Sequence, residues 1–213
     1  MDTEKMLSSI DHTCLKAYAT WEDIDRLCRE ALEFHTASVC IPPAFIKRVR
    51  EAYPELNICT VIGFPLGYNT TEIKAAETRQ AISDGADEVD MVINIGEVKA
   101  GNFSYVEEEI GRIRSDSEGK ILKVIIETCY LTEEEKVRLC EIVTRQKADY
   151  IKTSTGFGTG GATREDIRLF AENIGPEVKI KAAGGVKTLQ DMEDFINLGA
   201  DRIGSSSAVG LFK

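Results

Sequence analysis

The sequence predicts an α/β fold, a (β/α)8 TIM barrel, and three observations support this. Short apolar segments rich in β-branched residues alternate along the whole chain with amphipathic segments of helical period. Eight such pairs occur, and this alternation favours parallel strands joined by right-handed helical crossovers. The length of 213 residues is short for a barrel, so we expect brief loops and one domain spanning residues 1–213.

Each predicted element follows from its local pattern. Strands are expected at residues 10–14, 38–41, 58–63, 88–93, 122–127, 150–152, 178–181 and 202–204. Helices are expected at residues 21–34, 71–83, 105–114, 133–144, 164–172 and 189–197, and a short helix over residues 3–9 is expected to cover the barrel bottom. Helical period is clearest in the 21–34 segment, where Thr20 and Asp23 fit a capping box.

A recurring Gly-Ala-Asp phrase marks strand starts. It stands at residues 85–87 and 199–201, and Lys-Ala-Asp at 147–149 replaces it before the sixth strand. A glycine at this place is typical of a helix C-cap, so each phrase ends a helix and leads into a strand. Residues four or five positions later then lie at the carboxyl ends of strands, the catalytic face of a barrel. A doubly wound sheet is the alternative fold, but no G-x-G-x-x-G turn follows the first strand.

Two lysines end predicted strands that would be neighbours in the barrel. Lys152 precedes a Thr-Ser-Thr-Gly turn, and Lys181 precedes Ala-Ala-Gly-Gly. A desolvated lysine beside another cation loses affinity for its proton and becomes a nucleophile, which is the chemistry of a Schiff-base enzyme. The alternative for each lysine alone is a surface side chain that extends its charge to solvent, but equivalent positions on adjacent strands favour the functional interpretation.

An acidic residue and two glycine-rich turns complete the pattern. Asp90 lies in an apolar run, where it forms either a structural ion pair or an interior partner for the two lysines. Turns at residues 184–186 and 204–207 end the last two strands, where barrels commonly bind phosphate, although ordinary turn glycines are the alternative. Residues 206–212 can form a short helix there, whereas the glycine-rich 155–161 segment predicts only a flexible loop.

Composition excludes several classes of function. The net charge of −10, without a basic cluster, argues against a nucleic-acid partner. The six cysteines form no C-x-x-C pair and fit reduced, buried thiols, and with only two histidines metal catalysis is disfavoured. No apolar stretch is long enough for a membrane span, and the acidic, polar start predicts no signal peptide, so we expect no membrane partner and a cytoplasmic location.

With these residues in place, the chain resembles the deoxyribose-phosphate aldolase family of class I aldolases. The resemblance covers essentially the whole sequence. It rests on IDHT-x-L at residues 10–15, SVCI-x-P at 38–43, GFPLG at 63–67, GADEVDMVIN at 85–94, IKTSTGF at 151–157 and KAAGGV at 181–186. Several long phrases in the same order are far more specific than any one of them.

The resemblance implies a role for each matching residue. Lys152 would form the Schiff base, Lys181 would favour the neutral form of Lys152 and assist proton transfer, and Asp90 would relay protons with Lys181 and a water. The remaining implied residues contact the substrate, with Asp11, Thr13, Cys40 and Thr153 lining the site and Gly156, Gly184, Gly185, Gly204, Ser206 and Ser207 holding the phosphate.

The implied activity is a lyase reaction, the reversible cleavage of 2-deoxy-D-ribose 5-phosphate to D-glyceraldehyde 3-phosphate and acetaldehyde. The resemblance also implies no cofactor, no metal, a small phosphorylated sugar as partner, and a homo-oligomer, either dimer or tetramer. Some members carry a longer tail ending in a tyrosine near the active site. The present sequence ends at Lys213, so proton transfer is expected to rely on Asp90, Lys181 and water.

Two alternatives of function remain open on the sequence. One is a different Schiff-base aldolase with a ketose donor, which would keep Lys152 but change the donor pocket. The other is a non-catalytic phosphosugar-binding barrel, which would keep the phosphate glycines but would not need a buried lysine pair beside Asp90.

Overall fold

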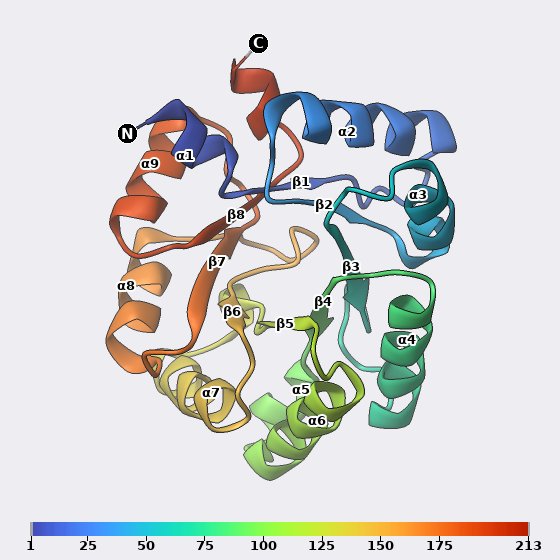
Figure 1. The fold of residues 1–213 in the computed structure, drawn as a ribbon. Helices are drawn as coiled ribbons and strands as arrows, with labels where there is room; N and C mark the ends of the chain where they lie inside the picture. The colour runs from blue at the N-terminus through green and yellow to red at the C-terminus, as the bar shows by residue number, and fades with distance from the viewer. Residues whose placement is uncertain (1, 213) are drawn as a thin grey trace.

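A computed structural model describes residues 2–212, and eight parallel strands in this part of the chain close into a barrel in sequence order (Figure 1). The strands are β1 (Ile10–Thr13), β2 (Ser38–Ile41), β3 (Ile58–Ile62), β4 (Glu88–Val92), β5 (Ile121–Ile125), β6 (Tyr150–Lys152), β7 (Lys179–Ala183) and β8 (Arg202–Ser205). Because β8 pairs back to β1, the predicted barrel is confirmed and the open doubly wound sheet is wrong.

Helices surround the barrel and connect successive strands (Figure 1). They are α2 (Trp21–Phe34), α3 (Ile46–Ala52), α4 (Thr71–Ser83), α5 (Ile95–Lys99), α6 (Phe103–Asp116), α7 (Glu133–Arg145), α8 (Arg164–Asn173) and α9 (Leu189–Asn197), with 3-10 turns η1 (Pro43–Phe45), η2 (Thr128–Tyr130) and η3 (Ala208–Phe212). All six long predicted helices form, and Thr20 and Asp23 make the expected capping box. The short helices α3 and α5 were not predicted.

The predicted N-terminal helix forms as α1 (Thr3–Leu7) and leads into β1. Met6 is its buried residue, so α1 covers only a small part of the barrel's N-terminal end. A second difference concerns β7, which starts one residue later and ends two residues later than predicted. Lys181 therefore lies in the middle of its strand, whereas Lys152 ends β6 as expected.

The three Ala-Asp phrases join neighbouring strands at the N-terminal end of the barrel. Gly85 and Gly199 adopt left-handed conformations (φ 110° and 112°), and Lys147 does so in the third phrase (φ 53°), as expected of helix C-caps. The aspartates that follow accept hydrogen bonds from the preceding strands: Asp87 from the Ile58 amide, Asp149 from Leu122 and Asp201 from Ile180. Each phrase thus aligns an even-numbered strand with the strand before it.

The two faces of the barrel wall differ in chemistry. One set of alternating strand residues packs outward in the main hydrophobic core against the helices, including Val89, Met91, Val124 and Ile151. The other set points inward, and in β4–β8 it consists largely of charged side chains. The hydrophobic core therefore lies between the barrel wall and the helices, and the barrel interior holds charged side chains.

A buried ion pair outside the barrel holds the carboxyl end of β4. Lys74 on α4 donates to Glu109 on α6 at 2.7 Å and to the Val92 carbonyl at 2.8 Å, and both charged side chains are fully buried. The other Glu109 oxygen accepts from the Asn94 amide at 3.0 Å. The pair thus ties two helices to the strand that carries Asp90.

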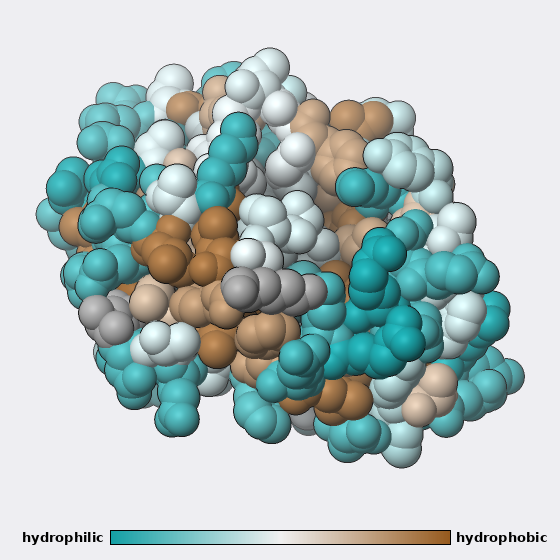
Figure 2. Space-filling model, turned by 90° about the horizontal axis from the view of Figure 1, so that it is seen from above, coloured by the Kyte–Doolittle hydropathy of each residue, from teal (hydrophilic) through white to brown (hydrophobic). Residues whose placement is uncertain are grey.

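Most of the surface visible in Figure 2, which views the side that carries η3 and α2, is hydrophilic. Hydrophobic residues gather there beside the C-terminal end of the chain, and Leu211 is one of the exposed large apolar side chains. Within residues 2–212, none of the helices is both long and apolar enough to cross a membrane.

We expect Lys74→Met to lower the free energy of unfolding by about 3–5 kcal/mol, because it leaves Glu109 buried without its cation. Urea denaturation followed by circular dichroism measures this. The matched control is Lys99→Met, since the Lys99–Glu135 pair has the same chemistry (2.8 Å) on the surface and should contribute less than about 1 kcal/mol. Equal losses in the two variants would contradict the argument from burial.

Candidate active site

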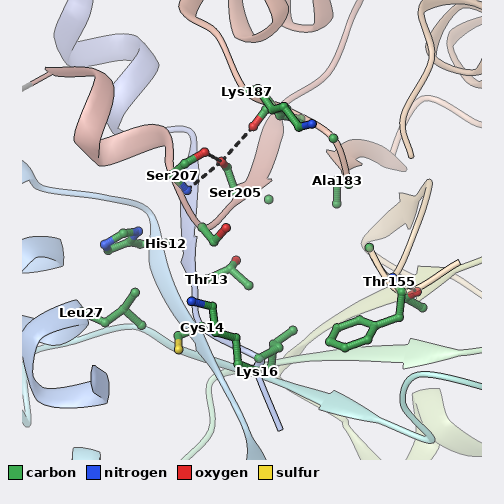
Figure 3. Close-up of a pocket in the computed structure, with 18 of the residues that line it drawn as sticks. His12, Thr13, Cys14, Lys16, Leu27, Thr155, Ala183, Lys187, Ser205 and Ser207 are labelled. Atoms are coloured by element: carbon green, nitrogen blue, oxygen red, sulfur yellow. Dashed lines mark hydrogen bonds between the residues drawn. The ribbon is translucent and has the colours of Figure 1, made fainter. Parts of the chain in front are cut away.

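A cavity of about 480 Å³ opens at the carboxyl end of the barrel (Figure 3). Its walls come from the segments that follow β1, β6, β7 and β8, together with one side of α2. The strand ends that the sequence marks as the catalytic face therefore surround one space. Among the residues predicted for the site, those that line it are Thr13, Lys152, Gly156, Gly184, Gly185, Gly204, Ser206 and Ser207.

Lys152 and Lys181 contact the same carboxylate oxygen. β6 and β7 pair in register so that the two lysines stand directly opposite each other. Each ammonium nitrogen lies 2.7 Å from Oδ2 of Asp90. Lys152 lines the cavity, whereas Lys181 and Asp90 are fully buried beneath it. The structure therefore brings together the three residues predicted to carry the chemistry.

Four further charged side chains extend this cluster below the cavity. Lys123 on β5 donates to Oδ1 of Asp90 at 2.8 Å and pairs closely with Glu88. Arg202 on β8 contacts Asp11 at 2.6 Å, and Asp11 also pairs closely with Lys181. The complete ion-pair network is Asp11, Glu88, Asp90, Lys123, Lys152, Lys181 and Arg202. It contains three carboxylates and four cations.

Sequence reasoning missed three members of this network. Glu88 lies two residues before Asp90 on the same strand, so period-two alternation places both on one face. Lys123 lies in the middle of the apolar β5, an anomaly of the same kind as Asp90. Arg202 directly follows a Gly-Ala-Asp phrase. Each signal was available, because a charge inside a buried strand requires a partner.

The charges set the protonation of the network. Burial alone would raise the pKa of Asp90, but Lys123, Lys152 and Lys181 outweigh burial and hold that pKa well below its usual value. Burial alone would lower the pKa of Lys181, but the carboxylates of Asp11 and Asp90 raise it above its usual value. Lys181 is therefore a permanent cation beside Lys152, and Asp90 a permanent anion between them.

Three residues predicted to line the site lie beneath it. Asp11 is fully buried and accepts a hydrogen bond from Ser38 at 2.7 Å, in addition to its ion pairs. Cys40 belongs to a small buried apolar cluster. Thr153 donates its hydroxyl to the Ala183 carbonyl at 3.0 Å and thereby joins the ends of β6 and β7. These three residues therefore support the floor of the cavity and do not line it.

The segment after β6 is held in place, although its glycines predict a flexible loop. Glu127, which has a left-handed backbone (φ 53°), accepts hydrogen bonds from the amide and hydroxyl of Thr155. The Phe157 ring packs edge-on against Phe64, with ring centroids 5.3 Å apart. Glu127 was not anticipated from the sequence, since a left-handed glutamate has no local signature.

The turns after β7 and β8 form a neutral, amide-rich cup. Gly184 and Gly185 both have positive φ (84° and 76°), a conformation that exposes successive amides and disfavours other residues. Ser205 accepts hydrogen bonds from the amides of Ser207 and Ala208 and donates to the Val186 carbonyl at 3.2 Å (Figure 3). The short helix predicted over residues 206–212 forms as η3, two residues later.

The possible metal ligands lie in and beside the ion-pair network. Among residues 2–212, two groups of three donor atoms lie close enough to share an ion, Cys40–Cys59–Asp90 and Asp11–Cys59–Glu88. The carboxylates in both groups already neutralise lysines or Arg202, and Lys123 lies 3.4 Å from the Cys59 sulfur. Surrounding cations make a further positive ion unfavourable, so these donors fit a salt-bridge network better than a metal centre.

Two buried lysines that share one carboxylate at the carboxyl end of a closed barrel are the arrangement expected of a Schiff-base aldolase. The chain belongs to the DeoC/LacD family of aldolases, whose sequence model matches residues 5–210. It is 60% identical to the deoxyribose-phosphate aldolase of Clostridium botulinum (strain Alaska E43 / Type E3), over 100% of this chain and 97% of that protein. It is 56% identical to the deoxyribose-phosphate aldolase of Clostridioides difficile (strain 630), over 98% and 95%.

Solved structures agree with this assignment. A putative deoxyribose-phosphate aldolase from Coccidioides immitis superposes with a TM-score of 0.95 at 35% identity, covering 99% of this chain and 85% of that one. The deoxyribose-phosphate aldolase of Aeropyrum pernix, described as tetrameric, gives a TM-score of 0.90 at 30% identity, covering 99% and 90%. The fold and the family inferred from the sequence are thus confirmed.

We expect the ion-pair network to make stability sensitive to acid. Burial alone would raise the pKa of Asp11, but Lys181, Lys123 and Arg202 lower it below its usual value. The unfolded chain then binds more protons than the folded protein as the pH falls, so the contribution of Asp11 is present at neutral pH and lost in acid. Between about pH 5 and about pH 2, the free energy of unfolding should therefore fall less steeply in Asp11→Asn than in the unmodified protein.

Urea titrations at a series of pH values measure these slopes. Glu134→Gln, on the exposed side of α7, is the matched control and should keep the slope of the unmodified protein. A slope in Asp11→Asn equal to that of the control would show that Asp11 does not titrate with folding.

Proposed function

We propose that this protein catalyses the reversible cleavage of 2-deoxy-D-ribose 5-phosphate to D-glyceraldehyde 3-phosphate and acetaldehyde through a Schiff base on Lys152. The observation that carries the proposal is the position of Lys152, which lines the cavity while its nitrogen contacts the carboxylate shared with Lys181. The names of the curated relatives support the choice of substrate.

The chemistry begins with the neutral amine of Lys152, which attacks the C1 aldehyde of the open-chain sugar. Loss of water gives an iminium, a better electron sink than the aldehyde. A base then removes the C3 hydroxyl proton and the C2–C3 bond breaks, which releases glyceraldehyde 3-phosphate and leaves an enamine of acetaldehyde. Protonation of the enamine carbon and hydrolysis by water release acetaldehyde and restore Lys152.

The neighbours of Lys152 support each proton transfer. The carboxylates of Asp11 and Asp90 raise the pKa of Lys181, so Lys181 keeps its positive charge beside the Lys152 nitrogen. Asp90 bridges the two nitrogens and, with Lys181 and a water, would form the relay that serves the C3 hydroxyl. Asp11 holds Lys181 from below, so it acts on the reaction through Lys181.

The neutral cup would hold the phosphate. Its contributors are Gly156, Gly184, Gly185, Gly204, Ser206 and Ser207, and Thr13 lines the same cavity. Backbone amides and hydroxyls donate to phosphate without needing a charged side chain. Cys40 and Thr153 would shape the floor on which the substrate rests.

The two alternatives from the sequence are less well supported. A non-catalytic phosphosugar-binding barrel has no use for three lysines around one buried carboxylate, which is costly to assemble. A ketose-specific Schiff-base aldolase would keep Lys152, but the full-length relatives at 56–60% identity carry the deoxyribose-phosphate aldolase name.

We further propose that residues 1–213 act as one domain in a homo-oligomer located in the cytoplasm, without a resident cofactor. The tetrameric Aeropyrum pernix relative supports an oligomer. The net charge of −10 supports a small-molecule partner over nucleic acid.

We expect borohydride reduction in the presence of acetaldehyde to trap a secondary amine on Lys152, detected by peptide mass mapping. Lys152→Ala should give no adduct and no 2-deoxyribose 5-phosphate from acetaldehyde and glyceraldehyde 3-phosphate. Lys179→Ala, a change of an exposed lysine two residues before Lys181, is the control and should retain the adduct. An adduct at another lysine, or no product from the unmodified protein, would contradict the proposal.

We expect Lys181→Leu to lower activity at neutral pH and to move the activity profile to higher pH. The substitution removes a positive charge beside Lys152, so Lys152 holds its proton more readily and the attacking form appears only in more alkaline solution. Lys181→Arg, which keeps the charge, should retain a profile close to that of the unmodified protein. An unchanged profile in Lys181→Leu would show that the two lysines are not coupled.

A further inference from the structure

The proposed phosphate cup contains no charged side chain, although its ligand would be a dianion. The cup residues are glycines and serines with their amides. A phosphate monoester carries a charge of about −1.5 to −2 at pH 7. A hydrogen bond between ionised groups is about twice as strong as a neutral one. A cation beside the cup would therefore add substantially to recognition of the phosphate.

Among residues 2–212, four cationic side chains line the cavity, and two of them already form ion pairs. Lys152 is bound to Asp90. Arg26 lies 2.7 Å from Asp23, which also lines the cavity. Lys16 and Lys187 line it as well, and among residues 2–212 neither forms an ion pair with a carboxylate. These two lysines are thus the candidates for a phosphate partner.

The directions of their side chains separate the two candidates. In Figure 3 the Lys16 nitrogen points into the cavity, toward the side on which His12 and Ser207 lie. The Lys187 nitrogen points toward Ala183 and away from Ser207. Lys16 therefore faces the part of the cup formed after β8, which Lys187 does not.

The present contact of Lys16 leaves it available. Its nitrogen lies 5.8 Å from the centre of the Tyr18 ring, and both side chains are exposed. A cation over an exposed ring is weakly held. Lys16 also belongs to the segment between β1 and α2, outside the rigid strands. The ammonium can therefore exchange the ring for an anion at small cost.

Local charge adds a second reason for a cation here. Asp23 and Glu30 bring carboxylates to the α2 side of the cavity, within a protein whose net charge is −10. Asp23 lies 2.7 Å from Arg26, and Glu30 lies 2.8 Å from His12. A further cation on this side of the cavity would offset carboxylate charge and favour the approach of a phosphate.

We propose that Lys16 pairs with the substrate phosphate and sets the preference of the enzyme for phosphorylated over unphosphorylated aldoses. The proposal rests on the proposed function and extends it to a residue outside the amide cup. In this proposal Lys16 binds the end of the substrate that does not react, whereas Lys152 binds the reacting carbon.

The test compares cleavage of 2-deoxy-D-ribose 5-phosphate with cleavage of 2-deoxy-D-ribose in Lys16→Gln. We expect kcat/KM for the phosphorylated sugar to fall by about 10- to 100-fold, mainly through KM, because a charge-assisted hydrogen bond is lost. The value for the unphosphorylated sugar should stay within about twofold, since that substrate never uses the ion pair. Inorganic phosphate should also become a weaker competitive inhibitor. Lys16→Arg should restore most of the preference.

Two further variants serve as comparisons. Lys47→Gln makes the same charge change on α3, outside the cavity, and should leave both substrates unaffected. Lys187→Gln should lower kcat/KM for the phosphorylated sugar far less than Lys16→Gln. An equal fall in the Lys187 variant would show a general electrostatic field and overturn the specific pairing.

The inference and the proposed function can fail separately. Equal losses with both sugars in Lys16→Gln would indicate a structural role and overturn the inference, as would an unchanged preference. Borohydride trapping with acetaldehyde, which carries no phosphate, should be normal in Lys16→Gln. Failure of the unmodified protein to form that adduct would instead contradict the proposed function.

Discussion

The Asp90 carboxylate, shared by three lysines inside the barrel, is the interaction on which the rest of the site depends. Lys152, Lys181 and Lys123 each lie 2.7–2.8 Å from one of its two oxygens. Burying three ammonium groups is unfavourable without an anion between them. The complete ion-pair network contains four cationic side chains and three carboxylates, so one positive charge in it has no matching carboxylate. That surplus positive charge lies beside Lys152, the lysine of the cluster that lines the cavity.

The buried charges inside the barrel also explain where the apolar packing of the fold lies. Because charges fill the inner side of β4–β8, apolar packing is concentrated between the barrel wall and the helices. The buried Lys74–Glu109 ion pair lies outside the barrel wall, between helices and strand. It holds the carboxyl end of the strand that carries Asp90. Positions in the reacting centre are thus fixed on rigid strands, which suits groups that must stay within hydrogen-bond distance.

Local sequence patterns predicted most of the fold and part of the site. Periodicity placed the eight strands and six long helices, and the capping glycines located the strand starts. The short helices α3 and α5 lack enough length for a periodic signal. Lys152, Lys181 and Asp90 were found because a charge in an apolar strand is anomalous, and Lys123 carried the same signal. The depth of Asp11, Cys40 and Thr153 could not be predicted, since it depends on the stagger of the closed barrel.

The reacting centre and the proposed phosphate cup differ in how they carry charge. At the reacting end, the buried ion pairs are held on strands, and the protonation states of Asp90 and Lys181 are fixed before a substrate arrives. At the proposed phosphate cup, neutral amides line the cavity, and Lys16 and Lys187 lie in the segments that follow β1 and β7. In the proposed function, binding energy from the phosphate would orient the aldehyde carbon against Lys152.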